Sequence, residues 1–196
     1  MVTTTKDRIL QEAAKLFTEK GYEATSVQDV AQALGLSKAA LYHHFRSKEE
    51  ILLAISLQAL EGLVRAGEEA SAHPDPEEAL LRFMEAHARF FEENYPFFVT
   101  MLQGIKSLSP ENRALTNRLR DRHEANLRAI LQRGIAAGVF RPVDVALAGR
   151  AVLSLLNWMI RWFRPGGPMR AVEVAQAYHD LILRGLKDGD TRAQGA

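Results

Sequence analysis

The sequence predicts an all-α fold, and three observations support this prediction. Apolar residues recur three and four positions apart through most of the chain, which is the spacing of one helical face. The two-residue alternation typical of half-buried strands is scarce. The apolar runs follow Ser, Thr, Asp or Pro, and several of them end at Gly. The 196 residues suffice for one large or two small domains, and we expect about nine helices.

The first helix is expected to begin at Thr4 or Thr5, either of which can cap it, and to end at about Lys20. Gly21 follows and supplies a stop. The apolar positions then define one buried face. That face consists of Ile9, Ala13, Leu16 and Phe17.

Two short helices joined by a tight turn are expected between Ser26 and Lys48. Ser26 can cap the first of them, and the Asp29 side chain can accept a hydrogen bond from the Ser26 amide, as in a capping box. Gly35 provides a left-handed stop, and Ser37 caps the second helix. The inward-facing apolar residues are Val27, Val30, Ala31, Leu34, Leu36, Leu41 and Phe45.

This pair of helices is the sequence form of a helix-turn-helix, whose second helix enters the major groove of DNA. Lysines neutralise phosphates, a tyrosine hydroxyl bonds a phosphate, and histidines contact a phosphate or a base edge. The hydroxyls that directly precede the first short helix, together with the free backbone amides at its N-terminus, can bind a phosphate. An ordinary helical pair with a polar face is the alternative. The candidate DNA contacts are Thr25, Ser26, Ser37, Lys38, Ala39, Tyr42, His43, His44 and Lys48.

Longer helices are expected over the rest of the chain. The fourth, over residues 48–72, has more apolar residues than one face needs, which suits a lever between a ligand and DNA. Residues 188–196 are polar and small, so we expect this tail to fray. The remaining helices are expected over residues 76–94, 97–105, 109–137, 145–164 and 169–187.

Aromatic residues and methionines are concentrated in the fifth and sixth helices. Together they suit an adaptable apolar cavity, because Met and Phe side chains form walls that change shape readily. Plain core packing is the alternative for each of them. The candidate cavity residues are Phe83, Met84, His87, Phe90, Phe91, Phe98, Met101, Leu102 and Ile105.

The charge distribution is uneven, although the formal net charge is only +1. Residues 1–50 carry 7 basic and 7 acidic groups, residues 51–100 carry 3 and 9, and residues 101–196 carry 15 and 8. The basic excess therefore lies away from the helix-turn-helix, so DNA affinity must come from local placement and from two copies. The C-terminal excess fits an anionic ligand. The residues of the seventh helix that are candidates for binding this ligand are chosen from charge alone. They are Arg113, Arg120 and Arg122.

The last two helices are too apolar for the remaining surface of one chain to cover, and their small residues allow close approach. We therefore expect a homodimer with a two-fold four-helix interface, which binds double-stranded DNA at an inverted repeat. The run over residues 145–163 is near membrane-spanning length, but Arg150, Asn157 and Arg161 interrupt it and argue against a span. The candidate interface residues are Val145, Gly149, Val152, Leu153, Leu156, Val174, Tyr178 and Leu181.

Composition also excludes several classes of protein. The chain has no cysteine, so disulfides and thiolate metal sites are excluded, and no His-rich or calcium-loop spacing indicates another metal. No histidine has an obvious carboxylate or nucleophile partner, so we expect no catalytic residue and no enzyme. The N-terminus lacks a signal segment, which predicts a cytoplasmic protein. The regulatory input is then a small organic molecule.

Two segments resemble a known family. Residues 40–51, Ala-Leu-Tyr-His-His-Phe-Arg-Ser-Lys-Glu-Glu-Ile, resemble the signature that ends the DNA-binding domain of TetR-family transcriptional regulators. Residues 16–27, Leu-Phe-Thr-Glu-Lys-Gly-Tyr-Glu-Ala-Thr-Ser-Val, resemble the exit of that family's first helix. The resemblance implies a TetR-like repressor that pairs through its last two helices. Its DNA-binding domain would span residues 1–47 and its ligand-binding and dimerisation domain residues 48–187.

Residues 156–168 resemble the exit of the eighth helix in TetR-type repressors of fatty-acid, phenylacetate and sterol degradation, whose effectors are acyl-CoA thioesters. Arginines pair with phosphates and tryptophans stack on adenine, while the Phe/Met cavity would take the acyl tail. No resident cofactor is implied. Tryptophans that merely fill the dimer core are one alternative. A multidrug-type repressor that binds cationic apolar compounds through Glu85, Glu92 and Glu93 is another, and a helical enzyme or adaptor is a third. The ligand residues in this segment are Asn157, Trp158, Arg161, Trp162 and Arg164.

Overall fold

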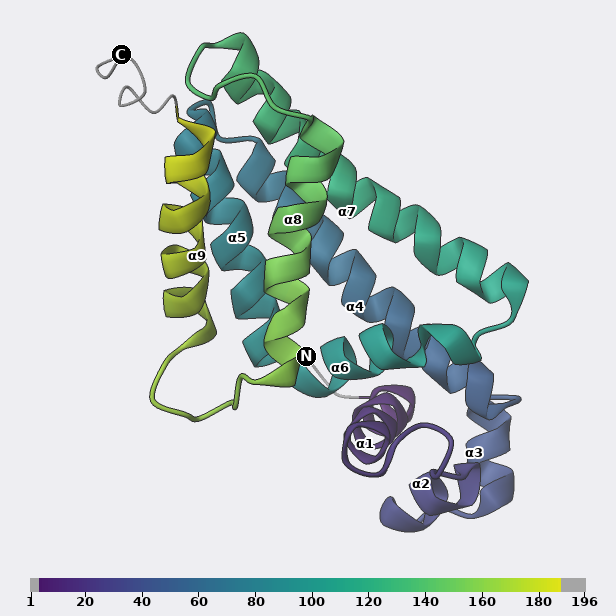
Figure 1. Ribbon diagram of the computed structural model, residues 1–196. Coiled ribbons are helices and arrows are strands. Elements are labelled where there is room, and N and C mark those ends of the chain that lie inside the picture. The colour runs from purple at the N-terminus through teal and green to yellow at the C-terminus, as the bar shows by residue number, and fades with distance from the viewer. Residues whose placement is uncertain (1–3, 188–196) are drawn as a thin grey trace, which may run out of the picture. The chain divides into compact units, whose positions relative to one another are not determined.

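The computed structural model describes residues 4–187, and within that range the chain is helical, with no strand. This confirms the predicted all-α class. The helices occur in the order shown in Figure 1. Their bounds are α1 Thr5–Lys20, α2 Val27–Ala33, α3 Lys38–His44, α4 Lys48–Ser71, α5 Pro76–Glu93, α6 Tyr95–Gly104, η1 Ile105–Ser107, α7 Pro110–Ala136, α8 Val145–Trp158, η2 Met159–Arg161 and α9 Ala171–Leu186.

The chain divides into two compact units. The N-terminal unit runs up to Glu61 and also includes Asn94–Leu119, whereas the C-terminal unit comprises Gly62–Glu93 and the chain from Arg120 onward. Helices α4 and α7 therefore each continue from one unit into the other. The predicted division after residue 47 stays a prediction. The predicted frayed tail, 188–196, lies outside the described residues.

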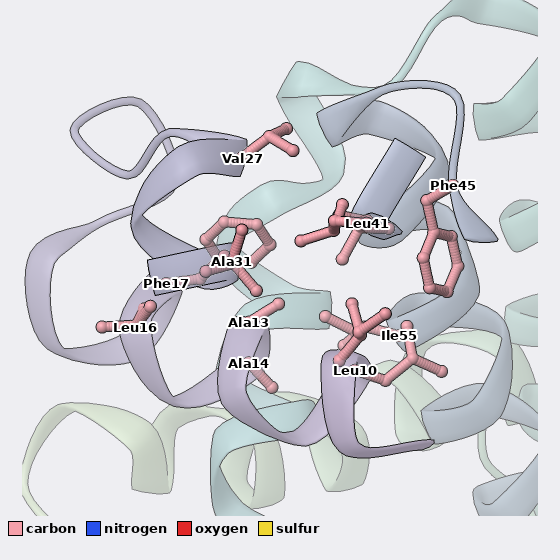
Figure 2. Packing of buried hydrophobic residues seen from close by; sticks show 13 residues of the cluster. Leu10, Ala13, Ala14, Leu16, Phe17, Val27, Ala31, Leu41, Phe45 and Ile55 are labelled. Carbon is pink, nitrogen blue, oxygen red and sulfur yellow. The ribbon is translucent and has the colours of Figure 1, made fainter. Parts of the chain in front are cut away.

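The core of the N-terminal unit lies between α1, α2, α3 and the first half of α4, where apolar side chains from all four helices converge (Figure 2). The buried face predicted for the first helix is confirmed, because all four of its residues are buried. Helix α6 packs on α1, and the Thr100 hydroxyl donates a hydrogen bond of 3.3 Å to the Ala14 carbonyl. The labelled core residues are Leu10, Ala13, Ala14, Leu16, Phe17, Val27, Ala31, Leu41, Phe45 and Ile55.

In the C-terminal unit α5 packs along α9 and also contacts α8. The Glu92 carboxylate of α5 accepts hydrogen bonds from the Arg170 side chain and the Ala171 amide, each at 3.2 Å. A carboxylate at this position is favourable, because the amides at a helix N-terminus carry partial positive charge. No helix among residues 4–187 combines the length and apolarity needed to cross a bilayer.

The end of the eighth helix differs from the prediction. The expected helix over residues 145–164 ends as an α-helix at Trp158, and the chain tightens into η2. This turn buries Phe163 against the ring of Phe91, at 5.4 Å between ring centroids, and Pro165 prevents the helix from resuming. Trp162 therefore lies beyond the last residue of η2 and not on α8. The ninth helix likewise begins at Ala171 rather than at residue 169.

Candidate nucleic-acid interface

The start of α2 has the predicted capping box. The Ser26 hydroxyl oxygen accepts from the Asp29 amide at 3.1 Å, and the Asp29 carboxylate accepts from the Ser26 amide at 2.7 Å. The Ser26 hydroxyl and amide together lower the pKa of the Asp29 carboxyl group. Gly35 has φ +66°, which confirms the left-handed stop, and the Leu36 amide returns to the Ala31 carbonyl at 2.9 Å. These bonds fix where α2 ends and where α3 begins.

Helix α3 has a buried face and an open face. Leu41 and Phe45 are buried in the core, as predicted, and the Ser37 hydroxyl oxygen accepts from the Ala40 amide at 3.1 Å. The exposed side chains on the other face come from a single helix seven residues long. Those exposed residues are Lys38, Ala39, Tyr42 and His43, with His44 half-buried beside them.

A surface hollow of about 420 Å³ lies beside α3, and five of the nine predicted DNA contacts line it. The Lys38 ammonium stands 5.9 Å from the centre of the Tyr42 ring. This arrangement places a cation and a phenol side by side, and both bind phosphate oxygens. The predicted contacts that line the hollow are Thr25, Ser26, Lys38, Tyr42 and Lys48.

Thr25 is a correction to the predicted set. Its side chain is fully buried, and its hydroxyl donates to the Gly21 carbonyl at 2.9 Å. The hydroxyl thus closes the turn between α1 and α2 and does not reach a phosphate. Sequence reasoning placed it outward because Thr25 directly precedes the capping serine, where both orientations are compatible with the pattern.

Lys48 is held in place within the protein. Its ammonium donates to the Tyr22 carbonyl at 2.9 Å and lies 4.2 Å from the centre of the Tyr22 ring. Burial raises the pKa of the Tyr22 phenol to about 12, with smaller contributions from Glu23 and Glu49. An ammonium has three donors, so this bond fixes the direction of Lys48 and leaves donors for another acceptor.

The C-terminal unit contains a buried polar cluster. Nδ1 of His87 lies 3.1 Å from Nε2 of His123, and the Asn157 side chain hydrogen-bonds His87. Burial lowers the pKa of His87 well below 6.5, with a further contribution from His123, and burial lowers that of His123 to about 4. Phe83 stacks on the His123 ring with centroids 4.8 Å apart. Sequence reasoning missed His123, because the two histidines lie 36 residues apart on separate helices.

The candidate ligand residues fall in both units. In the C-terminal unit Phe83, Met84, His87 and Phe91 are buried, and Phe90 is half-buried. In the N-terminal unit Phe98 and Met101 are buried, and Leu102 and Ile105 are half-buried. Burial is compatible with plain core packing and with a cavity wall, so the ligand assignment of these nine residues stays a prediction.

The arginines predicted to bind the ligand have different surroundings. Arg113 donates to the Lys106 and Leu108 carbonyls, at 3.2 and 3.0 Å, and thereby braces its own loop. Arg122 forms an ion pair with Glu68 at 2.6 Å. These contacts give both side chains a structural role that charge alone did not reveal. Burial lowers the pKa of Arg120, which is half-buried.

The exit of α8 exposes aromatic and cationic groups together. Trp158 is 62% exposed and Trp162 is 45% exposed. The Arg161 guanidinium lies 5.4 Å from the centre of the Trp158 ring, and Arg164 donates to the Phe163 carbonyl at 3.3 Å. An exposed indole next to a guanidinium is a surface on which a base or another aromatic ring can stack.

The predicted dimer residues require a correction. Gly149, Val152, Leu156 and Val174 are buried within one chain, so they face its own core. The exposed apolar surface of α8 lies on the opposite face. Leu181 of α9, which was predicted, is 69% exposed, whereas Val145, Leu153 and Tyr178 are half-buried. The exposed strip, as we call it, consists of Leu147, Ala151, Leu155, Trp158 and Leu181.

Comparison with known proteins identifies the family. A model described as "Bacterial regulatory proteins, tetR family" matches residues 9–55, and one described as "Tetracyclin repressor-like, C-terminal domain" matches residues 73–186. The second match alone covers more than half of the chain. The chain belongs to the TetR family.

Individual relatives agree with this assignment. This TetR-family chain is 32% identical over 194 residues to the HTH-type transcriptional repressor KstR2 of Mycolicibacterium smegmatis, with 97% of this chain and 92% of that one covered. The crystal structure of PfmR from Thermus thermophilus is 82% identical, covers 93% of this chain and 100% of that one, and has a TM-score of 0.89. AibR, crystallised with isovaleryl coenzyme A and operator DNA, is 26% identical with a TM-score of 0.83, covering 90% of this chain and 96% of that one.

Membership of the TetR family settles the general activity. Its regulators are transcription factors rather than enzymes, and they bind operators and small-molecule effectors, typically as dimers. The protein is therefore a DNA-binding transcriptional repressor of this family. The geometry of α2 and α3 agrees with that activity, because α3 presents a polar face beside a hollow lined by Lys38 and Tyr42.

Proposed function

We propose that the protein acts in the cytoplasm as a homodimer, represses genes by binding an inverted repeat, and is released from DNA by an acyl-CoA. The exposed face of α3 supports the DNA half of this proposal. Lys38 and Tyr42, whose side chains can bind phosphate, lie close together on that face. Leu41 and Phe45 are buried in the core and hold the helix in place. Two such helices related by a two-fold axis fit half-sites about 34 Å apart on DNA.

The exposed strip supports the homodimer. Leu147, Leu155 and Trp158 follow one another on one face of α8, and Leu181 is exposed on α9. A row of large apolar side chains in water is unfavourable, at roughly 25 cal/mol per Å² of apolar surface. A second copy related by two-fold symmetry offers the same strip and covers it.

The exit of α8 is the observation that carries the acyl-CoA proposal. Trp158 and Arg161 form an exposed stacking and cationic pair, and residues 101–196 hold 15 basic against 8 acidic groups. Coenzyme A offers an adenine ring and several phosphate charges, which match those two chemistries. The relative AibR, with isovaleryl coenzyme A in its crystal structure, is compatible with this ligand class.

A thermal-shift panel tests the effector. Acyl-CoAs of several lengths, free CoA and the matching free acids are each added to the dimer. A ligand present at 100 times its Kd stabilises the native state by about 2.7 kcal/mol, so the melting temperature rises. We expect a rise with acyl-CoAs and none with free acids, and that acyl-CoA should also release operator DNA in a titration.

Matched arginine variants locate the binding region. Arg161→Ala should lose most of the acyl-CoA shift, whereas Arg184→Ala, which removes the same charge from an exposed position on α9, should keep it. Equal shifts in the two variants would remove the α8 exit from the proposal. A panel in which no acyl-CoA raises the melting temperature would reject this effector class.

A second effector class is supported by one specific observation. A surface groove of about 540 Å³ lies between α4 and α5, with Phe90 and alanines in its wall. Its charged residues are Glu69, Glu78, Glu85, Glu93, Arg82 and Arg89. The carboxylates outnumber the arginines, which favours cationic apolar compounds, although Glu92 is committed to the start of α9. Release of operator by a cationic dye, without any effect of acyl-CoA, would favour this alternative.

A further inference from the structure

The segment that joins α6 to α7, residues 105–109, is hydrogen-bonded to two distant parts of the N-terminal unit. The Ser107 hydroxyl donates to the Glu23 carboxylate, in the turn between α1 and α2, at 2.9 Å. The Ser109 amide donates to the Glu49 carboxylate, in the first turn of α4, at 2.7 Å. We call residues 105–109 the α6–α7 segment. Its place beside the helix-turn-helix is therefore fixed within one compact unit.

Lys106 carries the only charge in the α6–α7 segment. The Arg113 guanidinium donates to the carbonyls of Lys106 and Leu108, at 3.2 and 3.0 Å, and so holds the backbone on which the Lys106 side chain stands. That side chain is exposed and forms no ion pair with any residue in the range 4–187. An exposed, hydrated ammonium contributes little to the stability of the fold, so its charge is available to a ligand.

The α6–α7 segment lies next to the hollow beside α3. Glu23, which accepts the hydrogen bond from Ser107, is one of the residues that line this hollow. The predicted DNA contacts Lys38 and Tyr42 line it too. Adjacent Cα atoms are about 3.8 Å apart, and the four-carbon stem of a lysine extends about 6 Å further. The Lys106 side chain therefore has the reach to meet a phosphate at the Glu23 edge of the hollow.

The charges at this edge indicate the kind of partner. Glu23 is exposed, and a carboxylate alone would repel a phosphate that approaches it. The Ser107 hydroxyl occupies that carboxylate, and Lys106 brings a compensating positive charge one residue away. Duplex DNA carries one negative charge per about 1.7 Å of helix axis, so further phosphates lie on either side of any bound one. A second cation next to the hollow matches a backbone with such closely spaced charges.

We propose that Lys106 binds a phosphate of the operator backbone, beside those that Lys38 and Tyr42 are predicted to bind. The DNA interface then extends beyond the helix-turn-helix to the α6–α7 segment. Hydrogen bonds already hold the backbone of this segment, so only the lysine side chain is ordered on binding. A phosphate contact carries no base information, so Lys106 strengthens binding to every DNA sequence alike. The inference rests on the DNA half of the proposed function and requires no effector.

The salt dependence of DNA binding tests this contact. The operator is a duplex selected from random sequences with the purified protein, and its affinity is measured by fluorescence anisotropy over a series of salt concentrations. Each neutralised phosphate contributes about 0.9 to the slope of log affinity against log salt concentration, so Lys106→Ala should reduce that slope by about 0.9 for each bound subunit. Affinity at low salt should fall about fivefold, for the operator and for unrelated duplexes alike. Lys106→Arg, which keeps the charge, should keep the wild-type slope.

Arg118→Ala is the matched control. Arg118 is exposed on α7 in the same unit, so the substitution removes one positive charge and leaves the α6–α7 segment intact. This control should keep the wild-type slope. An unchanged slope in Lys106→Ala would overturn the proposal, as would an equal reduction in Arg118→Ala, because the effect would then reflect net charge rather than a contact. Both results leave the proposed function standing, whereas a wild-type protein that binds no duplex would overturn the two together.

Discussion

His87 and His123 share a hydrogen bond of 3.1 Å between Nδ1 of the first and Nε2 of the second, and both side chains are buried. Burial lowers the pKa of both, and the proximity of His123 lowers that of His87 further. Two imidazoles in contact cannot both be charged in an apolar interior. The pair is thus neutral at pH 7, with one ring donating and the other accepting.

Acid should destabilise the C-terminal unit through this pair. An unfolded histidine titrates near pH 6.5, whereas His123 titrates at about 4 when folded. The unfolded state binds more protons between these values, so stability is full above about pH 6.5 and is lost as the pH falls. For His123 we expect a loss of about 2 kcal/mol between pH 7 and pH 5, measured by urea unfolding.

Two variants isolate the contribution of His123. His123→Phe keeps an aromatic ring against Phe83 and should flatten the pH dependence. His73→Phe makes the same substitution at a half-buried imidazole outside the pair and should leave the dependence as in the wild type. Parallel pH profiles for His123→Phe and the wild type would show that the pair does not govern acid stability.

Tyr42 should contribute to binding of every DNA sequence. Its side chain is 41% exposed on α3 and lines the hollow with Lys38. A phosphate contact carries no base information. Tyr42→Ala should therefore lower the affinity for the operator and for unrelated duplexes by a similar factor of about ten. Gel-shift titrations at one fixed salt concentration measure both. Unchanged affinity in Tyr42→Ala would remove Tyr42 from the interface.

The sequence predicted the helix-turn-helix closely, because its signals are local. Caps at Ser26 and Ser37 and the φ +66° turn at Gly35 depend on residues within one or two helical turns. Thr25 shows the limit of such reasoning. Whether its hydroxyl faces a phosphate or the Gly21 carbonyl depends on how α1 meets α2, which no local pattern encodes.

The C-terminal half was harder to predict, because its contacts are distant in sequence. Apolar residues surround α8 on more than one side, so periodicity could not tell Val152, which is buried, from Leu155, which is exposed. The end of α8 at Trp158 depends on the burial of Phe163 against α5. The His87–His123 pair similarly requires α5 and α7 to be adjacent, a fact that the packing alone provides.

Ser26 should stabilise the N-terminal unit through its capping box. Ser26→Ala removes the acceptor for the Asp29 amide, and substitutions of this kind cost about 1 kcal/mol. The expected result is a lower urea midpoint with an unchanged slope. Ser26→Ala also removes the bond of 2.7 Å that the Ser26 hydroxyl donates to the Asp29 carboxylate. Ser37→Ala gives a matched comparison: it removes a single bond from the Ala40 amide, with no acidic residue in the first turn of α3, and should cost less. Equal losses would show that the bond between the Ser26 hydroxyl and the Asp29 carboxylate adds nothing.

The exposed strip makes a prediction about assembly. In a homodimer paired through α8 and α9, Leu155→Glu would place a carboxylate at an apolar interface, and an unpaired buried charge costs several kcal/mol. The variant should run as a monomer in light scattering and should lose most of its affinity for an inverted repeat, since one helix-turn-helix alone binds a single half-site. Leu115→Glu is the control, because Leu115 is a leucine of α7 with similar exposure, 41% against 38%. If Leu155→Glu stays dimeric with wild-type affinity, the copies pair through another surface, and the apolar face of α8 must be covered in a different way.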